Sequence, residues 1–337
     1  VAIYAGTTER LVVTSSGLTV NGSAISGGVS VLGSLTDVSM DITNFTDGLL
    51  IQPNSDGSAP TTGTLSGANY NTGIGKSTFT ALTTGDYNTG YGYNTLVALT
   101  TGSQNTALGA HSLDANTTGS NTTAVGHNCL GSQTTGYENT GVGVNVLSSL
   151  TTALHNVAVG YGTSTAVTTG GENVAMGDYS LDANTTASSN TAIGHYALTD
   201  NTTGANNVAL GWRSLFANTT GADNTAVGKG SLDANTTGGF NTAIGINALS
   251  ANTTASHNIA VGRNALTVNT TGTQNVSVGG ESLSLNTTGG SNTALGNNSL
   301  QANTTASNNT AVGYYALKVN TTAANNVAVG AYTLDAN

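Results

Sequence analysis

Apolar and polar residues return along this chain in a unit of 17 residues. The unit opens with NTAVG or a close variant at Asn71 and repeats without an insertion up to Asn326, with Thr122 opening one copy in place of Asn. Position 2 is always Thr, Val or Ile, position 3 is Ala, Gly or Ser, position 4 is apolar and position 5 is Gly. A period kept without slippage is typical of repeat proteins whose units stack on one another.

Positions 2 to 4 predict a short β-strand in every unit, because β-branched residues are enriched in strands. Side chains alternate along a strand, so positions 2 and 4 share one face and position 3 points the other way. Since position 3 is always small, we expect that side to pack tightly against a second surface, such as a neighbouring chain. Position 9 is Leu in every copy except two, which have Phe79 and Ser164. Such a regular leucine predicts a residue in the core.

The invariant glycine at position 5 ends the predicted strand. A glycine in every copy indicates a positive φ angle or a close approach between backbones. The predicted structural turn glycines include Gly75, Gly109, Gly126, Gly160, Gly194, Gly228, Gly262, Gly296 and Gly330.

These features predict an all-β fold, a parallel β-roll or β-solenoid with 17-residue coils. The solenoid shaft is expected over residues 71–337, as sixteen repeats of which the last is incomplete. Residues 1–70 lack the repeat and are expected to form a non-repetitive, β-rich N-terminal junction that sets the register between chains. A triple β-spiral, in which three chains interleave hairpins, is the alternative for the details.

Composition narrows the function classes. Only 7% of the residues are charged, the formal net charge is −10, and there are six Lys and Arg residues in 337. Nucleic-acid phosphates attract Lys and Arg, so no nucleic-acid partner is expected. The chain contains no run of about 18 apolar residues, so no membrane span is expected.

Candidate catalytic and metal-binding residues are sparse. The acidic residues at position 10 recur several coils apart, roughly 15 Å or more at the strand spacing, whereas a glycosidase pair needs about 5–9.5 Å. The five histidines never show metal-ligand spacing. Cys129 is expected to be a small buried filler. We therefore expect no enzyme, no catalytic residue, no metal and no cofactor; the position-10 acids are Asp114, Asp182, Asp233 and Asp335.

Asn-Thr-Thr triplets at Asn116, Asn184, Asn201 and further copies also match the N-glycosylation motif. Stacked Asn and Thr side chains can instead form hydrogen-bonded ladders between coils, and this is the preferred interpretation.

Aromatic residues cluster just after the turn glycine and at other turn positions. Exposed aromatics can stack on sugars or anchor a protein partner. The candidate receptor-contact residues are Tyr93, Tyr161, Tyr179, Tyr196, Trp212, Phe216, Phe240, Tyr314 and Tyr315, which Tyr332 joins.

The NTAVG unit followed by a small residue and Leu resembles the head repeats of trimeric autotransporter adhesins. The longer form, as in NTTGADNTAVGKGSL, and the N-terminal RLVVTSSGLTVNGS are similar to the repetitive region of bacteriophage tail fibres. This resemblance implies a homotrimeric, rigid viral fibre in the virion tail, outside the cell, with other tail proteins and a host-surface glycan or protein as partners. A bacterial surface adhesin is the first alternative, and a polysaccharide-cleaving tail spike is the second.

Overall fold

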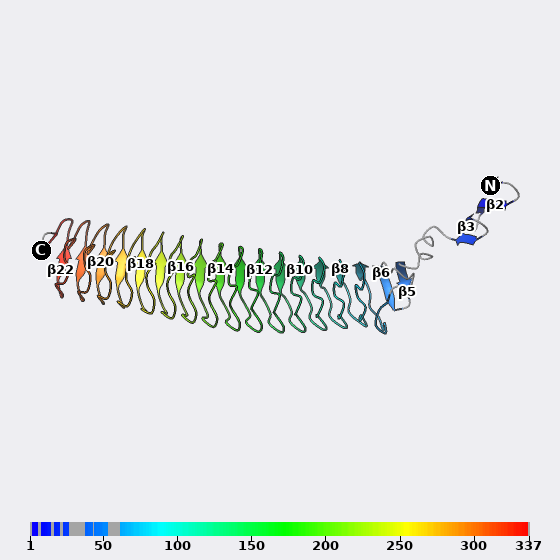
Figure 1. Ribbon diagram of the computed structural model, residues 1–337, viewed down its shortest axis with the longest axis horizontal. Coiled ribbons are helices and arrows are strands. Elements are labelled where there is room, and N and C mark those ends of the chain that lie inside the picture. Colours follow the sequence, from blue (N-terminus) through cyan, green and yellow to red (C-terminus); the bar gives the residue numbers. More distant parts are fainter. Residues whose placement is uncertain are drawn as a thin grey trace. The chain divides into compact units, whose positions relative to one another are not determined.

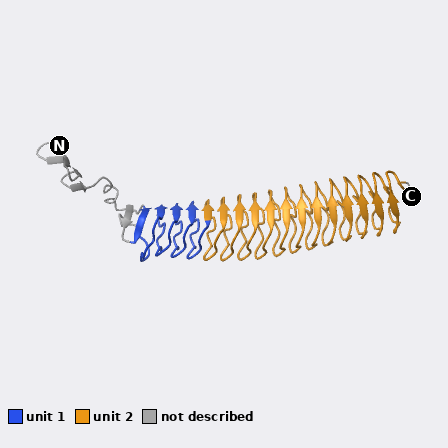
Figure 2. Ribbon diagram, turned by 180° about the vertical axis from the view of Figure 1, so that it is seen from behind, with its two compact units in different colours: residues 1–122 blue, residues 123–337 orange. Residues whose placement is uncertain are grey.

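The computed structural model of the protein describes residues 44–52 and 61–335, and the backbone of five strands between residues 2 and 42. The chain forms two compact units, Val1–Thr122 and Thr123–Asn337 (Figure 2).

The first unit contains two kinds of sheet. Four strands pair antiparallel in chain order: β1 (Ala2–Ala5), β2 (Thr8–Thr14), β3 (Gly17–Val20) and β4 (Ser23–Ser26). Strand β5 (Val38–Ile42) pairs antiparallel with β6 (Phe45–Ile51). From β6 onward the pairing is parallel, through β7 (Thr72–Ile74), β8 (Thr89–Tyr91) and β9 (Thr106–Leu108). The parallel ladder of this unit thus begins at β6, ahead of the first NTAVG repeat.

The second unit is one parallel ladder of three-residue strands, which lie side by side in chain order (Figure 1). Each strand residue pairs with the residue 17 positions later, as Thr225 does with Thr242. This ladder confirms the all-β fold and the β-solenoid with 17-residue coils. The strands are β10 (Thr123–Val125), β11 (Thr140–Val142), β12 (Val157–Val159), β13 (Val174–Met176), β14 (Thr191–Ile193), β15 (Val208–Leu210), β16 (Thr225–Val227), β17 (Thr242–Ile244), β18 (Ile259–Val261), β19 (Val276–Val278), β20 (Thr293–Leu295), β21 (Thr310–Val312) and β22 (Val327–Val329).

The direction of the strand side chains differs from the prediction. Position 3 points into its own coil: Ala226 is fully buried, and Ser277 Oγ lies 2.5 Å from the hydroxyl of Ser282 at position 8. Positions 2 and 4 point outward, and Leu210 is 43% exposed. The prediction that position 3 packs on a neighbouring chain was therefore wrong. The small side chain is needed because the interior of a 17-residue coil is narrow.

Inside the solenoid, the side chain at position 8 of one coil lies against position 3 of the next coil. A Cβ on Gly141 would lie 2.6 Å from Cys129 Sγ, so the bulkier Cys129 is accommodated by a glycine opposite it. The equivalent pair farther along, Ala197 and Ala209, has two alanines, and both are fully buried. A larger side chain at position 8 is therefore matched by a smaller residue at position 3 of the next coil, as close packing of a protein interior requires.

We expect Gly141→Ala to lower the free energy of unfolding by about 1–3 kcal/mol, because the new methyl group overlaps Cys129 Sγ. Adding Cys129→Ala should restore most of the loss, since it recreates the Ala197–Ala209 pairing. Urea denaturation of the four proteins of this double-mutant cycle measures the coupling. Additive effects of the two substitutions would contradict the proposed contact.

The first residue of each coil forms a ladder of buried amides. Asn224 Nδ2 donates to Asn207 Oδ1 at 3.2 Å and to Gly238 O at 2.9 Å. The Oδ1 of Asn224 accepts from the backbone N and the Nδ2 of Asn241, at 3.0 and 3.2 Å. The same amide therefore joins three consecutive coils, and its polar atoms are satisfied without water.

Left-handed backbone conformations turn the chain at the corners of the coil. Every glycine at position 5 from Gly75 to Gly330 has a φ angle between 123° and 142°. Non-glycine residues at positions 7, 9 and 17 also have positive φ, and Leu232 at position 9 has a φ of 50°. A leucine in this region is strained, but Leu232 is fully buried, and burial of its side chain offsets the strain.

Candidate interaction surfaces

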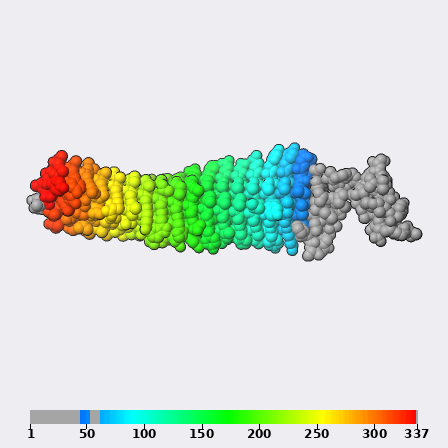
Figure 3. All heavy atoms as spheres, turned by 90° about the horizontal axis from the view of Figure 1, so that it is seen from above, coloured from blue at the N-terminus to red at the C-terminus, as the bar shows by residue number. Residues whose placement is uncertain are grey.

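The outward side of positions 2 and 4, here called the strand face, is an uncharged and largely apolar surface. Position 2 carries only Thr, Val or Ile and position 4 carries only aliphatic residues, Met176 or Tyr91. Pairing between strands satisfies the backbone, so the exposed part of this face consists of side chains such as Leu210 and Ile244, 43% and 40% exposed. Large contiguous apolar patches on a folded protein mark interaction sites. The stacked coils of the second unit present a continuous surface (Figure 3).

Stacking the coils brings together aromatic residues that are 17 to 20 positions apart. Tyr179 lies 5.5 Å from Tyr161 and 5.5 Å from Tyr196 between ring centroids, and Phe216 lies 6.0 Å from Tyr196. A second cluster joins Tyr314, Tyr315 and Tyr332, with centroids 4.1 to 5.6 Å apart. Stacked and edge-to-face rings stabilise one another by about 0.5–1.5 kcal/mol per pair.

The other candidate aromatics have their own neighbours. Tyr93 meets His111 edge-on at 5.3 Å, and Phe240 stacks on His257 at 5.1 Å. The candidates therefore occupy separate places on successive coils instead of one common site.

Hydrogen bonding and neighbouring rings alter the acidity of two tyrosines. The hydrogen bond with Tyr315, followed by desolvation, raises the pKa of Tyr314 to about 12. Desolvation and the charge of Tyr161 raise the pKa of Tyr179 above its ordinary value. A raised pKa keeps both phenols neutral at pH 7, with their hydroxyls hydrogen-bonded to neighbouring tyrosines.

Trp212 and Arg213 form the most polar aromatic cluster. The Arg213 guanidinium lies 4.1 Å from the Phe216 ring centroid and 5.5 Å from that of Trp212. Its Nε and Nη2 donate to the two carboxylate oxygens of Asp233, at 3.0 and 3.2 Å. Desolvation raises the pKa of nearby Asp200, although the Arg213 charge opposes the shift. Arg213 was not anticipated from the sequence; its spacing of 20 residues from Asp233 was the available signal.

The acidic residues at position 10 each lie next to different turn groups. His111 Nδ1 lies 3.2 Å from Asp114 Oδ2, the backbone N of Thr165 donates to Asp182 Oδ1 at 3.3 Å, and Asp233 holds Arg213. Asp335 is half-buried on the last described coil. No two position-10 acids among the described residues face each other in these contacts. Within residues 44–52 and 61–335, no group of three or more His, Cys, Asp or Glu is placed to hold a metal ion.

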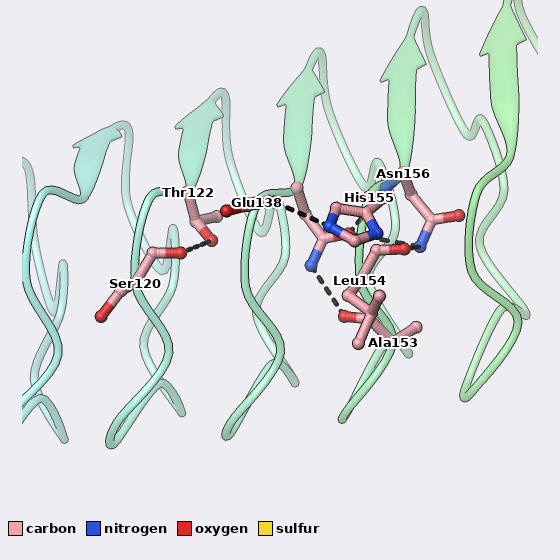
Figure 4. A network of polar contacts seen from close by, with 8 residues as sticks. Ser120, Thr122, Glu138, Ala153, Leu154, His155 and Asn156 are labelled. Carbon is pink, nitrogen blue, oxygen red and sulfur yellow. Dashed lines mark hydrogen bonds and ion pairs between the residues drawn. The ribbon is translucent and has the colours of Figure 1, made fainter.

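A network of polar contacts surrounds Asn156 (Figure 4). His155 Nε2 lies 2.7 Å from Glu138 Oε2, one coil away, and both side chains are partly exposed. Asn156 Nδ2 donates to Asn139 Oδ1 at 3.2 Å and to Leu154 O at 3.3 Å. The surface ion pair therefore lies over the buried amide ladder, where it adds little stability of its own.

The Asn-Thr-Thr triplets form ladders inside the solenoid. Asn201 Nδ2 donates to Asn184 Oδ1 at 3.2 Å, and Asn218 Nδ2 to Asn201 Oδ1 at 2.8 Å. Asn116, Asn184 and Asn201 are fully buried. The ladder interpretation is confirmed, and a glycan on these amides is incompatible with the fold.

Cys129 is fully buried behind the strand. Burial raises the pKa of its thiol to about 12, against a weaker lowering by the backbone of Val125. The group is therefore a neutral thiol at pH 7, which is a poor nucleophile.

The sequence matches no known protein family, no curated protein and no solved structure. Nowhere in the described part of the chain does a helix have the length and apolar character needed to cross a bilayer.

Proposed function

We propose that this chain is the structural protein of a viral fibre, a bacteriophage tail fibre in which three copies form a rigid rod that attaches the particle to its host. The single observation that carries the proposal is the uncharged, apolar strand face, which repeats at every coil.

The strand face suits a second copy of the same chain better than an unrelated partner. Its apolar rows repeat once per coil, at the strand spacing of roughly 4.8 Å. Only a partner with the same repeat can match such rows along their whole length. Heterologous contacts around a three-fold axis close into a ring, which leaves no strand face exposed.

The proposed mechanism is mechanical. Parallel pairing at every coil and buried amide ladders resist bending, and the absence of charge on the strand face removes repulsion between copies. The proposed location is the virion tail, outside the cell, with other tail proteins and a host-surface glycan or protein as partners. A bacterial surface adhesin would use the same rod. Electron microscopy of labelled particles distinguishes this alternative from a tail fibre.

We expect the wild-type protein to sediment as an elongated particle of about 100 kDa, three times the chain mass of 33.2 kDa. Leu210→Lys with Ile244→Lys should yield monomers with the native far-UV circular dichroism spectrum, because charges on the strand face lose water on association. The matched control, Thr220→Lys with Thr254→Lys, changes exposed position-14 residues and should stay trimeric. A monomeric wild type, or an unaffected strand-face variant, would refute self-association through this face.

Immunogold labelling separates the biological roles. Antibodies against the chain should decorate the tails of purified phage particles. Labelling of a bacterial surface alone would favour the adhesin, and release of oligosaccharides from host-surface polysaccharide by the pure protein would favour the cleaving spike.

A further inference from the structure

Position 7 of successive coils forms a row of side chains that is interrupted at Gly230. Arg213 lies one coil before it and Asn247 one coil after it. Gly230 is buried with a φ angle of 64°, and a Cβ there would lie 2.8 Å from Asn247 Oδ1. A hollow of about 520 Å³, here called the Gly230 hollow, opens beside this glycine and falls within the usual range of small-molecule sites.

The other glycine at position 7, Gly162, has a bulkier neighbour in the next coil. A Cβ on Gly162 would lie 3.1 Å from the ring of Tyr179, so this ring covers the gap. The Gly230 hollow therefore depends on which residues follow the glycine, and it is not a general feature of the repeat.

The walls of the hollow combine an aromatic ring with fixed polar groups. The aromatic ring belongs to Trp212, a residue that is 46% exposed to solvent. Asp233 is held in place by its two hydrogen bonds with Arg213. Asn247 supplies an amide, and Ser250 supplies a hydroxyl that also contacts Thr267 O and Oγ1, at 3.2 and 3.0 Å.

These groups match the chemistry of a pyranose ring. The indole offers a flat apolar surface for the C–H face of a sugar. A carboxylate accepts hydrogen bonds, an amide both donates and accepts, and a hydroxyl does both, as neighbouring sugar hydroxyls require. The Lys229 ammonium, 5.1 Å from the Trp212 ring centroid, is exposed and can move aside or donate to a sugar hydroxyl.

Charge favours a neutral sugar over an acidic one. The Asp233 carboxylate, which accepts from Arg213 Nε and Nη2, lies on the wall of the hollow and its negative charge disfavours a carboxylate or phosphate on the ligand. The formal net charge of −10 on the chain also repels anions.

We propose that the Gly230 hollow binds one neutral hexopyranose unit, stacked on Trp212 and hydrogen-bonded to Asp233 and Asn247. This inference rests on the proposed function, since it names the sugar class that such a fibre would contact on a host surface.

Trp212 is the one tryptophan of the chain, so its fluorescence reports on the hollow alone. Titration of the full-length protein with methyl glycosides of glucose, galactose and mannose should give a saturable blue shift with at least one of them. N-acetylneuraminic acid, an anionic sugar, should give at least tenfold weaker binding.

Gly230→Asn should abolish the saturable shift, because the new side chain projects into the hollow between Trp212 and Asn247, while asparagine tolerates this backbone conformation, as at Asn128 and Asn145. Gly162→Asn is the matched control at the same coil position and should bind as the wild type does. Circular dichroism of both variants verifies the fold.

A wild-type protein whose emission responds to none of the neutral glycosides, or a Gly230→Asn variant that binds them unchanged, would overturn this inference. Preferential binding of N-acetylneuraminic acid would also overturn it. The mass and the immunogold labelling are measured without sugar, so a trimeric tail protein that binds no hexose would lose this inference and keep the proposed function.

Discussion

Gly126→Ala is expected to lower the free energy of unfolding by about 2–6 kcal/mol, the sum of backbone strain and overpacking. Gly126 has a φ angle of 135°, which side-chain-bearing residues rarely adopt. Its added Cβ would lie 2.6 Å from the carbonyl carbon of Gly143 in the next coil and would overlap the attached oxygen. Backbone atoms in a paired coil cannot move aside, so the ladder must open at this point.

Gly280→Ala is the matched control for Gly126→Ala. Gly280 follows a position-5 glycine and has no positive φ angle, and the one close contact of its added Cβ would be with the side-chain Oδ1 of Asn297, at 2.7 Å. Asn297 is exposed and can change rotamer, so a change below about 1 kcal/mol is expected. Chemical denaturation followed by circular dichroism compares the two variants, and equal midpoints would contradict the role assigned to the turn glycine.

Asn224→Ala is expected to lower the free energy of unfolding by about 2–4 kcal/mol. The backbone N–H of Asn241 loses its acceptor, a buried unsatisfied donor costs about 1–3 kcal/mol, and the deleted amide leaves a small cavity in addition. Asn297→Ala removes an exposed amide and should change the stability by less than about 0.5 kcal/mol. Thermal and urea denaturation measure both variants.

Asn224→Asp tests the contribution of the hydrogen bonds alone, because aspartate and asparagine have nearly the same side-chain volume. The carboxylate keeps the acceptor for Asn241 but cannot donate to Gly238 O, and its burial raises its pKa in the folded state. The protonated acid restores a donor, so the loss of stability relative to wild type should be large at pH 7 and shrink as the pH falls toward the pKa of an unfolded aspartate. A loss independent of pH would show that the amide ladder is not the cause.

Much of the candidate interaction surface is formed by residues of neighbouring coils, which are not adjacent in the sequence. The sequence identifies Trp212 from its place just after a turn glycine and Phe216 from another turn position. The Gly230 hollow could not be identified in this way, because it arises from the residues one coil before and one coil after the glycine. Its signal was the spacing of Arg213, Gly230 and Asn247, each 17 residues from the next.

The sequence by itself determined the coil: its length, its short strand at positions 2 to 4, its turn glycine and its stacked Asn-Thr-Thr ladder. These features follow from local rules, because a 17-residue period without insertions is typical of units that stack in register.

Only the tertiary structure decided which side of the strand is inside. The alternation of side chains predicts two faces but does not say which one closes the coil, and apolar residues at positions 2 and 4 suggested the wrong one. A coil of this size has room for Ala226 and Leu232 but not for a second row of branched side chains as well. The apolar residues therefore lie outside, on the strand face, where another chain can cover them.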